Sequence, residues 1–257
     1  MSGEDFALLA PHLGRCTLKR GDVLVEEDGL IEHVSFPEGS ISSIIASSPE
    51  GLKIEAGIVG KEGCVPLSVI LGSDRSPHRI VIQLADGAYR IARPALIDAI
   101  EESASYGFRM IASRCGNRPR SGAARARDTV SESDRPETAS LRNLLLRFVQ
   151  VRGLQTNFTA LSNAVHPIDE RLARRLLMCH DRSPTNEMAL THDFLSLMLA
   201  VRRPSVTTAL HVLEGNGFIR TERGHITIRD RRGLEEFAQD AYGRPEAEYR
   251  RLIGPLD

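Results

Sequence analysis

The sequence lacks a membrane-spanning segment, a secretory signal and the cysteine and histidine cluster of a metal site. Its four cysteines, Cys16, Cys64, Cys115 and Cys179, are scattered and form neither a C-x-x-C pair nor a tight cluster with histidine, which argues against disulfide bridges and a structural zinc site. The amino terminus is acidic where a secretory signal is basic, and the longest apolar runs are too short to span a bilayer. These absences predict a soluble cytoplasmic protein with no membrane partner, metal or cofactor.

An excess of charge of one sign is also missing. The 33 lysine and arginine residues stand against 34 aspartate and glutamate residues, so the formal net charge is −1 and any surface for nucleic acid must be local. Signatures such as G-x-S-x-G, S-x-x-K, H-E-x-x-H and glycine-rich phosphate loops do not occur. The nearest catalytic-looking group, Cys179-His180-Asp181, consists of consecutive residues at a helix end that point in different directions. We therefore expect no enzymatic activity.

The first third of the chain alternates between turn signals and short segments rich in β-branched residues. Turns are marked by Arg20-Gly21-Asp22, Asp28-Gly29 and Pro37-Glu38-Gly39, and the segments between turns include DVLVEE, ISSIIAS and HRIVIQL. This spacing predicts a β barrel or β-roll, which we assign to residues 1–105. A helix from about Pro94 to Ser103 should close this domain, because proline suits the first turn of a helix.

Residues 106–140 change in character. They are rich in arginine, serine, glycine, alanine and proline and have no sustained apolar period, which predicts a polar linker or an insertion. A linker of this length is unusual inside a compact domain, so it should separate two functional parts. A locally aberrant reading frame is the alternative explanation.

Residues 141–165 carry apolar side chains at intervals of three and four, which predicts one long amphipathic helix. Such a helix either covers the core of its own domain or forms a coiled-coil dimer seam with a second copy. We favour the seam, because the helix is long and is followed at once by Pro167 and a new amphipathic helix from Ile168 to Met178. Residues 166–257 then form a separate domain.

The segment from Leu190 to Asp230 predicts a winged helix-turn-helix. Thr191 can cap a short helix, a tight break follows at Ala200-Val201, and a second helix begins near Arg202. Gly215-Asn216-Gly217 should end that helix, and alternating residues around an Arg223-Gly224 turn predict a small β-hairpin, or wing. Two short helices joined by so short a turn project the second helix into a major groove.

Basic residues concentrate in this segment. Seven arginines stand against three acids between Ala200 and Arg232, a local net charge of +4 that can neutralise phosphates. Arg202 and Arg203 can hold a guanine, Thr207 and Thr208 can reach a base edge or a thymine methyl, and Ser205 and His211 suit phosphates or the groove edge. The alternative is a merely solvated helix face. The candidate DNA-binding residues are Arg202, Arg203, Pro204, Ser205, Thr207, Thr208, His211 and Arg223.

Three stretches, ERLARRLLMCHDR from Glu170, LTHDFLSLMLAVRRPSVTTALHVLEGNGFI from Leu190 and RGHITIRDRRGLEEFA from Arg223, resemble the carboxy-terminal half of the cyclic-AMP receptor protein and Fnr (Crp/Fnr) family of transcription regulators. KRGDVLVEEDG from Lys19 resembles the effector-sensing β-roll of that family, with weaker motifs. The resemblance implies an α+β fold with an amino-terminal β-roll, a long dimerisation helix and a carboxy-terminal winged helix-turn-helix.

The resemblance also implies how the protein acts. A homodimer held by helix 141–165 would place two recognition helices in successive major grooves of double-stranded DNA at a palindromic operator, and RNA polymerase becomes a candidate partner. The base-reading positions fall on Arg203, Pro204 and Thr208, with Arg202 and Ser205 beside them as phosphate contacts. Pro204 has no side-chain donor, so its contact with a base can only be apolar.

The effector half departs from the family pattern. Cyclic-nucleotide binders of the family have a Gly-Glu pair and an Arg-Ser pair, whereas Glu62-Gly63-Cys64 has no glutamate after glycine and Arg75-Ser76 lies one position from its expected place. We therefore expect a degenerate sensor that does not bind cyclic AMP. The alternative is a β-roll whose small-molecule or cyclic-nucleotide ligand controls DNA binding. Cys16 also stands without the neighbouring cysteines with which Fnr-like members hold an iron-sulfur cluster, and Ala200 stands where relatives usually have glycine.

Overall fold

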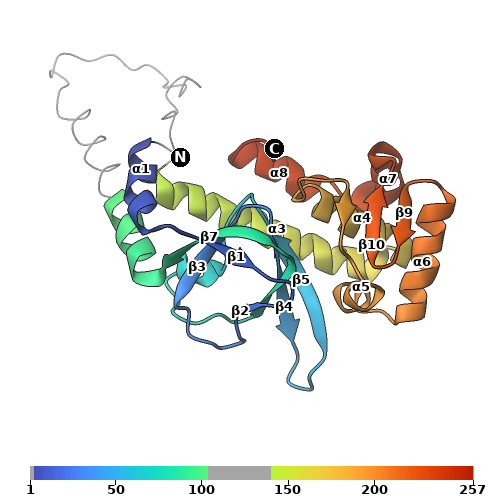
Figure 1. Ribbon diagram of the computed structural model, residues 1–257, viewed down its shortest axis with the longest axis horizontal. Coiled ribbons are helices and arrows are strands. Elements are labelled where there is room, and N and C mark those ends of the chain that lie inside the picture. Colours follow the sequence, from blue (N-terminus) through green and yellow to red (C-terminus); the bar gives the residue numbers. More distant parts are fainter. Residues whose placement is uncertain (1–2, 104–139, 257) are drawn as a thin grey trace, which may run out of the picture.

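The computed structural model describes residues 3–103 and 140–256 (Figure 1). Helices and sheets are both present and are arranged as a β-rich amino-terminal half, a long central helix and a mostly helical carboxy-terminal half, which confirms the predicted α+β class. Residues 106–139 of the predicted linker, which include Cys115, lie outside the described residues. None of the helices in the described ranges is long and apolar enough to cross a membrane.

The amino-terminal half begins with two short helical turns and continues with seven strands. Their bounds are α1 (Gly3–Leu9), η1 (Ala10–His12), β1 (Gly14–Leu18), β2 (Val23–Val25), β3 (His33–Pro37), β4 (Ile41–Ser47), β5 (Lys53–Val59), η2 (Leu67–Val69), β6 (Arg79–Leu84) and β7 (Asp86–Ala92). Described residues 93–103 are helical, in agreement with the predicted helix. The strands form two antiparallel sheets, ordered β1-β7-β3 and β2-β6-β4-β5. The β-roll is therefore confirmed, and neither sheet closes into a barrel.

The roll encloses a core to which the central helix also contributes. Strand β4 lies between β6 and β5, and its first five residues are buried. Val34, Ile80 and Leu96 from the roll share one apolar cluster with Phe148 from the central helix. Phe148 lies against Gly63, where a Cβ atom would be only 1.9 Å from the ring Cζ. Glycine at 63 therefore lets this aromatic ring enter the roll.

The central helix and the carboxy-terminal half follow after residue 140. Their elements are α3 (Leu141–Val165), α4 (Ile168–His180), β8 (Glu187–Met188), α5 (His192–Leu199), α6 (Arg203–Gly215), β9 (Ile219–Glu222), β10 (His225–Ile228), α7 (Arg231–Ala238), η4 (Gln239–Ala241) and α8 (Arg244–Leu252). Helix α3 has the bounds predicted from its periodicity, and Ser140 caps it by accepting a hydrogen bond from the Asn143 amide. Strands β8, β10 and β9 form a small antiparallel sheet.

Helix α3 is apolar on two different surfaces. Its first half buries Leu141, Leu145 and Phe148 in the core of the roll. Its second half leaves large apolar side chains in solvent, since Leu161 is 47% exposed and Val165 is 63% exposed. The helix thus covers a core at one end and presents an uncovered apolar surface at the other.

The two halves of the chain are packed against each other. Ile41 and Ile58 from the roll belong to the apolar cluster that forms the core of the carboxy-terminal half, together with residues such as Leu176. Helix α8 returns to α3, and its Tyr249 joins the core of the roll and donates a hydrogen bond from its hydroxyl to the Glu62 carbonyl (3.1 Å). The orientation of the helix-turn-helix region is therefore coupled to the roll.

Candidate nucleic-acid interface

The first helix of the predicted helix-turn-helix is α5. The Thr191 hydroxyl accepts a hydrogen bond from the Phe194 amide at 3.3 Å, which makes Thr191 the predicted N-cap. The helix buries Leu195 and Met198 and ends at Ala200, whose φ of 51° and ψ of 44° are left-handed. Glycine adopts this conformation without a penalty, so alanine here costs on the order of 1 kcal/mol.

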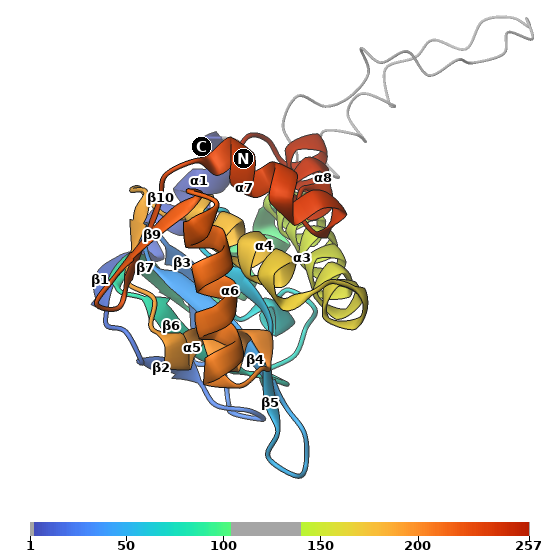
Figure 2. The same ribbon diagram turned by 90° about the vertical axis from the view of Figure 1, so that its right-hand side faces the viewer.

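The second helix, α6, exposes the face that carries the predicted contacts. Arg202 is its N-cap, Pro204 lies in its first turn, and Val206 and Leu210 are buried against the domain core. The opposite face leaves the side chains of Arg202, Arg203, Pro204, Thr208 and His211 exposed. Helix α6 lies at the end of the molecule away from the roll, and in the view onto that end it stands in front of the other elements (Figures 1 and 2).

Two of the predicted residues are partly engaged within the protein. The Thr207 hydroxyl donates to the Arg203 carbonyl at 3.2 Å and lies 3.1 Å from His192 Nδ1 of α5, so this side chain points toward α5. Ser205 is half-buried and lines an open groove between the α5–α6 turn and the β4–β5 hairpin. The hydroxyl of Thr208 donates to the Pro204 carbonyl at 3.1 Å, and its side chain remains exposed.

The guanidinium of Arg203 already has an acidic neighbour. Its Nη1 lies 3.2 Å from Asp193 Oδ1 of α5, and the two side chains are 64% and 73% exposed. Such an exposed ion pair contributes little to stability, which leaves the guanidinium free to exchange partners.

The wing lies beside α6 and is tied to it. Strands β9 and β10 pair around Arg223 and Gly224, whose φ values of 34° and 85° form the tight turn. Glu214 of α6 accepts hydrogen bonds from the Thr221 amide at 2.8 Å and from the Thr221 hydroxyl at 2.9 Å. These bonds lower the pKa of the Glu214 carboxyl, because they stabilise its charged form. This anchor escaped the sequence analysis, since no local pattern links Glu214 to a strand.

The basic patch is smaller in space than in sequence. Arg231 is half-buried, and its Nη2 contacts Asp181 Oδ1 at 2.7 Å while its Nε contacts Glu235 Oε1 at 2.8 Å. Arg220 and Arg232 form exposed ion pairs with Glu222 and Glu236. Of the seven arginines between residues 200 and 232, three are exposed and form no ion pair with a described residue, namely Arg202, Arg223 and Arg229. Arg231 adds little charge to this surface, because Asp181 and Glu235 neutralise it.

The residues that the family resemblance assigns to an effector contact other parts of the protein. Glu62 Oε1 accepts a hydrogen bond from Arg182 Nε at 2.6 Å with both side chains buried, and Cys64 is fully buried. Arg75 Nη1 donates to the Asp28 carbonyl at 2.6 Å. A cavity of about 10 Å³, which holds a water molecule at most, is bordered by Glu62, Phe148 and Arg152. A second, apolar cavity of about 320 Å³ shares Glu62 and Phe148 with it and is also lined by Gly63 and Cys64.

The cysteines in the described ranges do not form a sensor cluster. Cys64 and Cys179 are buried, and burial raises the pKa of the Cys64 thiol to about 12. A thiol with so high a pKa supplies almost no thiolate at neutral pH. Within residues 3–103 and 140–256 no group of three or more histidine, cysteine, aspartate or glutamate residues is placed to hold a metal ion.

Comparisons with known proteins agree with this geometry. The Crp-like helix-turn-helix domain family matches residues 170–237. No curated protein matches the chain. Among solved structures, a transcriptional regulator assigned to the Crp/Fnr family from Eubacterium rectale superposes with a TM-score of 0.60 at 17% identity, over 93% of this chain and 95% of its own.

Two further structures have a similar fold. FixK2 from Bradyrhizobium japonicum gives a TM-score of 0.60 at 13% identity, over 88% of this chain and 98% of its own. The c-di-GMP responsive regulator CLP from Xanthomonas campestris gives 0.57 at 14% identity, over 88% of this chain and 99% of its own. Residues 170–237 therefore form a Crp-like helix-turn-helix domain, the chain has the fold of Crp/Fnr transcriptional regulators, and both findings confirm the resemblance to that family.

Proposed function

We propose that the protein is a sequence-specific DNA-binding transcription regulator that binds a palindromic operator as a homodimer. The observation that carries this proposal is the outward face of α6, which exposes Arg203, Pro204 and Thr208 at the end of the molecule with the wing beside them. A helix presented in this way fits a major groove. Acting on transcription would place the protein in the cytoplasm, with RNA polymerase as a partner of the bound dimer.

The exposed side chains divide into two roles. Arg203 and Thr208 would contact base edges, and Pro204 would make an apolar contact such as one with a thymine methyl. Arg202, Arg223 and His211 are exposed and would contact phosphates, as would Ser205 from its half-buried position. Thr207 would act by supporting the first turn of α6, since its hydroxyl is engaged with Arg203 and His192.

The second half of α3 supports a homodimer. Leu161 and Val165 are exposed at its end, and Leu154 and Phe158 are only partly buried. A second copy of α3 running alongside would cover these side chains, as in a coiled coil. Pairing of two copies would also give the two α6 helices the twofold symmetry that a palindrome requires. In this arrangement residues 1–105 form the roll, 106–140 the linker, 141–165 the dimer helix and 166–257 the DNA-binding domain.

The side chains that α3 places against the roll support a degenerate sensor. The ring of Phe148 occupies the space beside Gly63, and Arg152 and Gln155 approach the backbone at Gly57 so closely that a Cβ atom there would lie 2.5 Å from Gln155 Oε1. A cyclic nucleotide needs a cation and hydrogen-bond donors around its phosphate and an empty volume for its ring. A cyclic nucleotide placed beside Gly57 and Gly63 would compete for this space with Phe148, Arg152 and Gln155.

A second candidate is a regulator that responds to a small molecule bound at the junction of the roll and α3. An apolar cavity of about 320 Å³ lies between the roll, α1, the first half of α3 and α8, and is lined by residues including Gly63, Cys64, Leu144 and Ile253. This volume falls within the range of ligand pockets. The similar fold of the c-di-GMP responsive CLP shows that such regulators can respond to a ligand. Thermal-shift screening with apolar metabolites and nucleotides separates the two candidates, because only the second predicts stabilisation by one of them.

Selection of bound duplexes from a random pool tests the main proposal. The expected result is a palindromic consensus with half-sites about one helical turn apart, bound by a dimer with strong dependence on salt. Recovery of no consensus, or binding of the full-length protein to every duplex with equal affinity at moderate salt, would contradict it.

A further inference from the structure

A buried ion pair joins the DNA-binding half to the roll. Arg175 of α4 donates hydrogen bonds from Nη1 and Nη2 to the two carboxylate oxygens of Glu55 on β5, with Nη2 to Oε2 at 2.6 Å. Both side chains are about 95% buried, with exposed fractions of 5% and 4%. Nη2 also donates to Gln83 Oε1 of β6 at 2.5 Å. Two strands of the roll therefore hold one guanidinium of α4.

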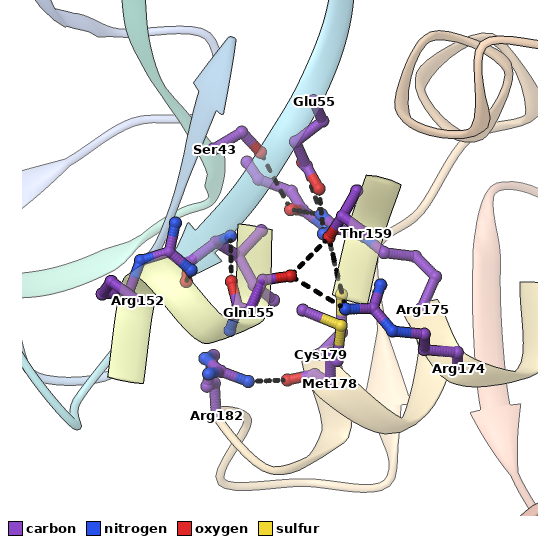
Figure 3. A network of polar contacts seen from close by, with 12 residues as sticks. Ser43, Glu55, Arg152, Gln155, Thr159, Arg174, Arg175, Met178, Cys179 and Arg182 are labelled. Carbon is purple, nitrogen blue, oxygen red and sulfur yellow. Dashed lines mark hydrogen bonds and ion pairs between the residues drawn. The ribbon is translucent and has the colours of Figure 1, made fainter. Parts of the chain in front are cut away.

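Further contacts surround this pair (Figure 3). Gln83 also accepts a hydrogen bond from the Ser43 hydroxyl and donates to Cys179 Sγ of α4 at 3.3 Å. Next to Arg175, Arg174 Nη2 lies 3.2 Å from Thr159 Oγ1 of α3, so the two adjacent arginines bind different elements. The side chains converge from the roll, α3 and α4 on the space between them.

Helix α3 contributes the third side of the network. Gln155 Oε1 accepts a hydrogen bond from the Ile58 amide at 3.1 Å, and Arg152 Nη1 donates to the Ile58 carbonyl at 3.0 Å. Both bonds reach the end of β5, the strand that carries Glu55. Strand β5, α3 and α4 are thus connected by hydrogen bonds between their own residues.

The two buried charges of Glu55 and Arg175 depend on each other and have a specific geometry. Burial raises the pKa of the Glu55 carboxyl, and the guanidinium of Arg175 opposes that rise, so each charge depends on the other. A bidentate pair also adds geometric specificity to the packing of its two elements. Helix α4 carries this orientation to α6, because Leu172 and Leu176 of α4 share one core with Leu210 and Leu213 of α6.

We propose that Glu55, Gln83 and Arg175 form a latch that positions α6 relative to the dimer helix, and thereby sets the half-site spacing that the protein accepts. The inference rests on the proposed function. It assigns to these three residues a role in specificity although none of them lies on the DNA-facing surface.

The test compares the full-length protein with its Glu55→Gln variant on labelled duplexes. The duplexes carry the selected palindrome with the two half-sites at their selected spacing or moved by about one or two base pairs. Glu38→Gln is the matched control, because it makes the same change on the roll but removes only the exposed ion pair of Glu38 with Arg15. We expect Glu55→Gln to bind the selected spacing about tenfold more weakly and to distinguish the spacings less than the wild type does, whereas Glu38→Gln should match the wild type.

The variant Arg175→Lys keeps the positive charge but loses the bidentate geometry. It replaces Glu55→Gln in the same experiment if Glu55→Gln does not fold. It should also lose discrimination between spacings. An equal loss of affinity at every spacing in the folded variant would overturn the latch, because it would indicate a role in stability alone. Unchanged discrimination would also overturn it. A wild-type protein that binds no palindrome would instead refute the proposed function, and the latch with it.

Discussion

Two Arg-Arg pairs in the carboxy-terminal half lie in opposite environments. Arg174 and Arg175 are buried on α4, with exposed fractions of 6% and 4%, whereas Arg202 and Arg203 are exposed at the start of α6. The first pair follows Leu172-Ala173 and precedes two further buried leucines within a continuous helix, and the second follows a turn. The same dipeptide therefore makes buried contacts between elements in α4 and is exposed to solvent at the start of α6. A cluster of arginines does not by itself mark a DNA-binding face.

The largest expected effect is a difference in the free energy of unfolding between variants of the buried and the exposed arginine pair. Arg175→Ala should lower the free energy of unfolding by about 3 to 5 kcal/mol, because it leaves the buried carboxylate of Glu55 without its partner. Arg202→Ala should change it by less than about 0.5 kcal/mol, since the side chain is exposed. Denaturant unfolding of both variants measures the difference. Similar values for the two variants would break the comparison.

The next effect concerns specificity. Arg203→Ala should cost about 1 to 3 kcal/mol in binding to the selected operator and relax the preference at one base pair of each half-site. Its thermal stability should remain that of the wild type, because the ion pair with Asp193 is exposed. Binding measured on operators with each base replaced in turn checks the prediction. A retained preference at every position would exclude Arg203 as a base contact.

A smaller and more uniform effect is expected at Arg202. The variant Arg202→Ala should weaken binding to all sequences alike and reduce the slope of log affinity against log salt by about 1 for each phosphate contact that is lost. Titrations over a range of salt concentrations distinguish this variant from Arg203→Ala. A change in base preference would assign the two neighbouring arginines the opposite roles.

The smallest effect tests the wing by pH. The pKa of Glu214 is lowered in the folded protein, so its contribution to stability is present above its ordinary value of 4.5 and is lost as pH falls through the lowered pKa. The difference in melting temperature between the wild type and Glu214→Gln should therefore shrink as the pH is lowered below about 4.5. Glu236→Gln, which alters an exposed ion pair on α7, is the control. A pH-independent difference would show that the Thr221 contacts do not depend on the charge.

The sequence by itself predicts the elements whose causes are local. The bounds of α3 follow from apolar residues at intervals of three and four, the start of α5 follows from Thr191 as N-cap, and the wing follows from period-two alternation around Arg223-Gly224. Each of these signals lies within a few residues of the structure that it specifies. Of these elements, α5 and the wing lie within residues 170–237, which match the Crp-like helix-turn-helix domain family.

Only the tertiary structure decided which charged residues are paired inside the protein and which remain free to contact a partner. Glu55 and Arg175 are separated by 120 positions, and Arg231 and Asp181 by 50, so no local pattern shows that their charges are paired. The filling of the roll beside Gly63 likewise depends on Phe148, which arrives from a distant helix. Periodicity reports which face of an element is buried, but a buried charge requires a partner that only the packing of distant segments provides.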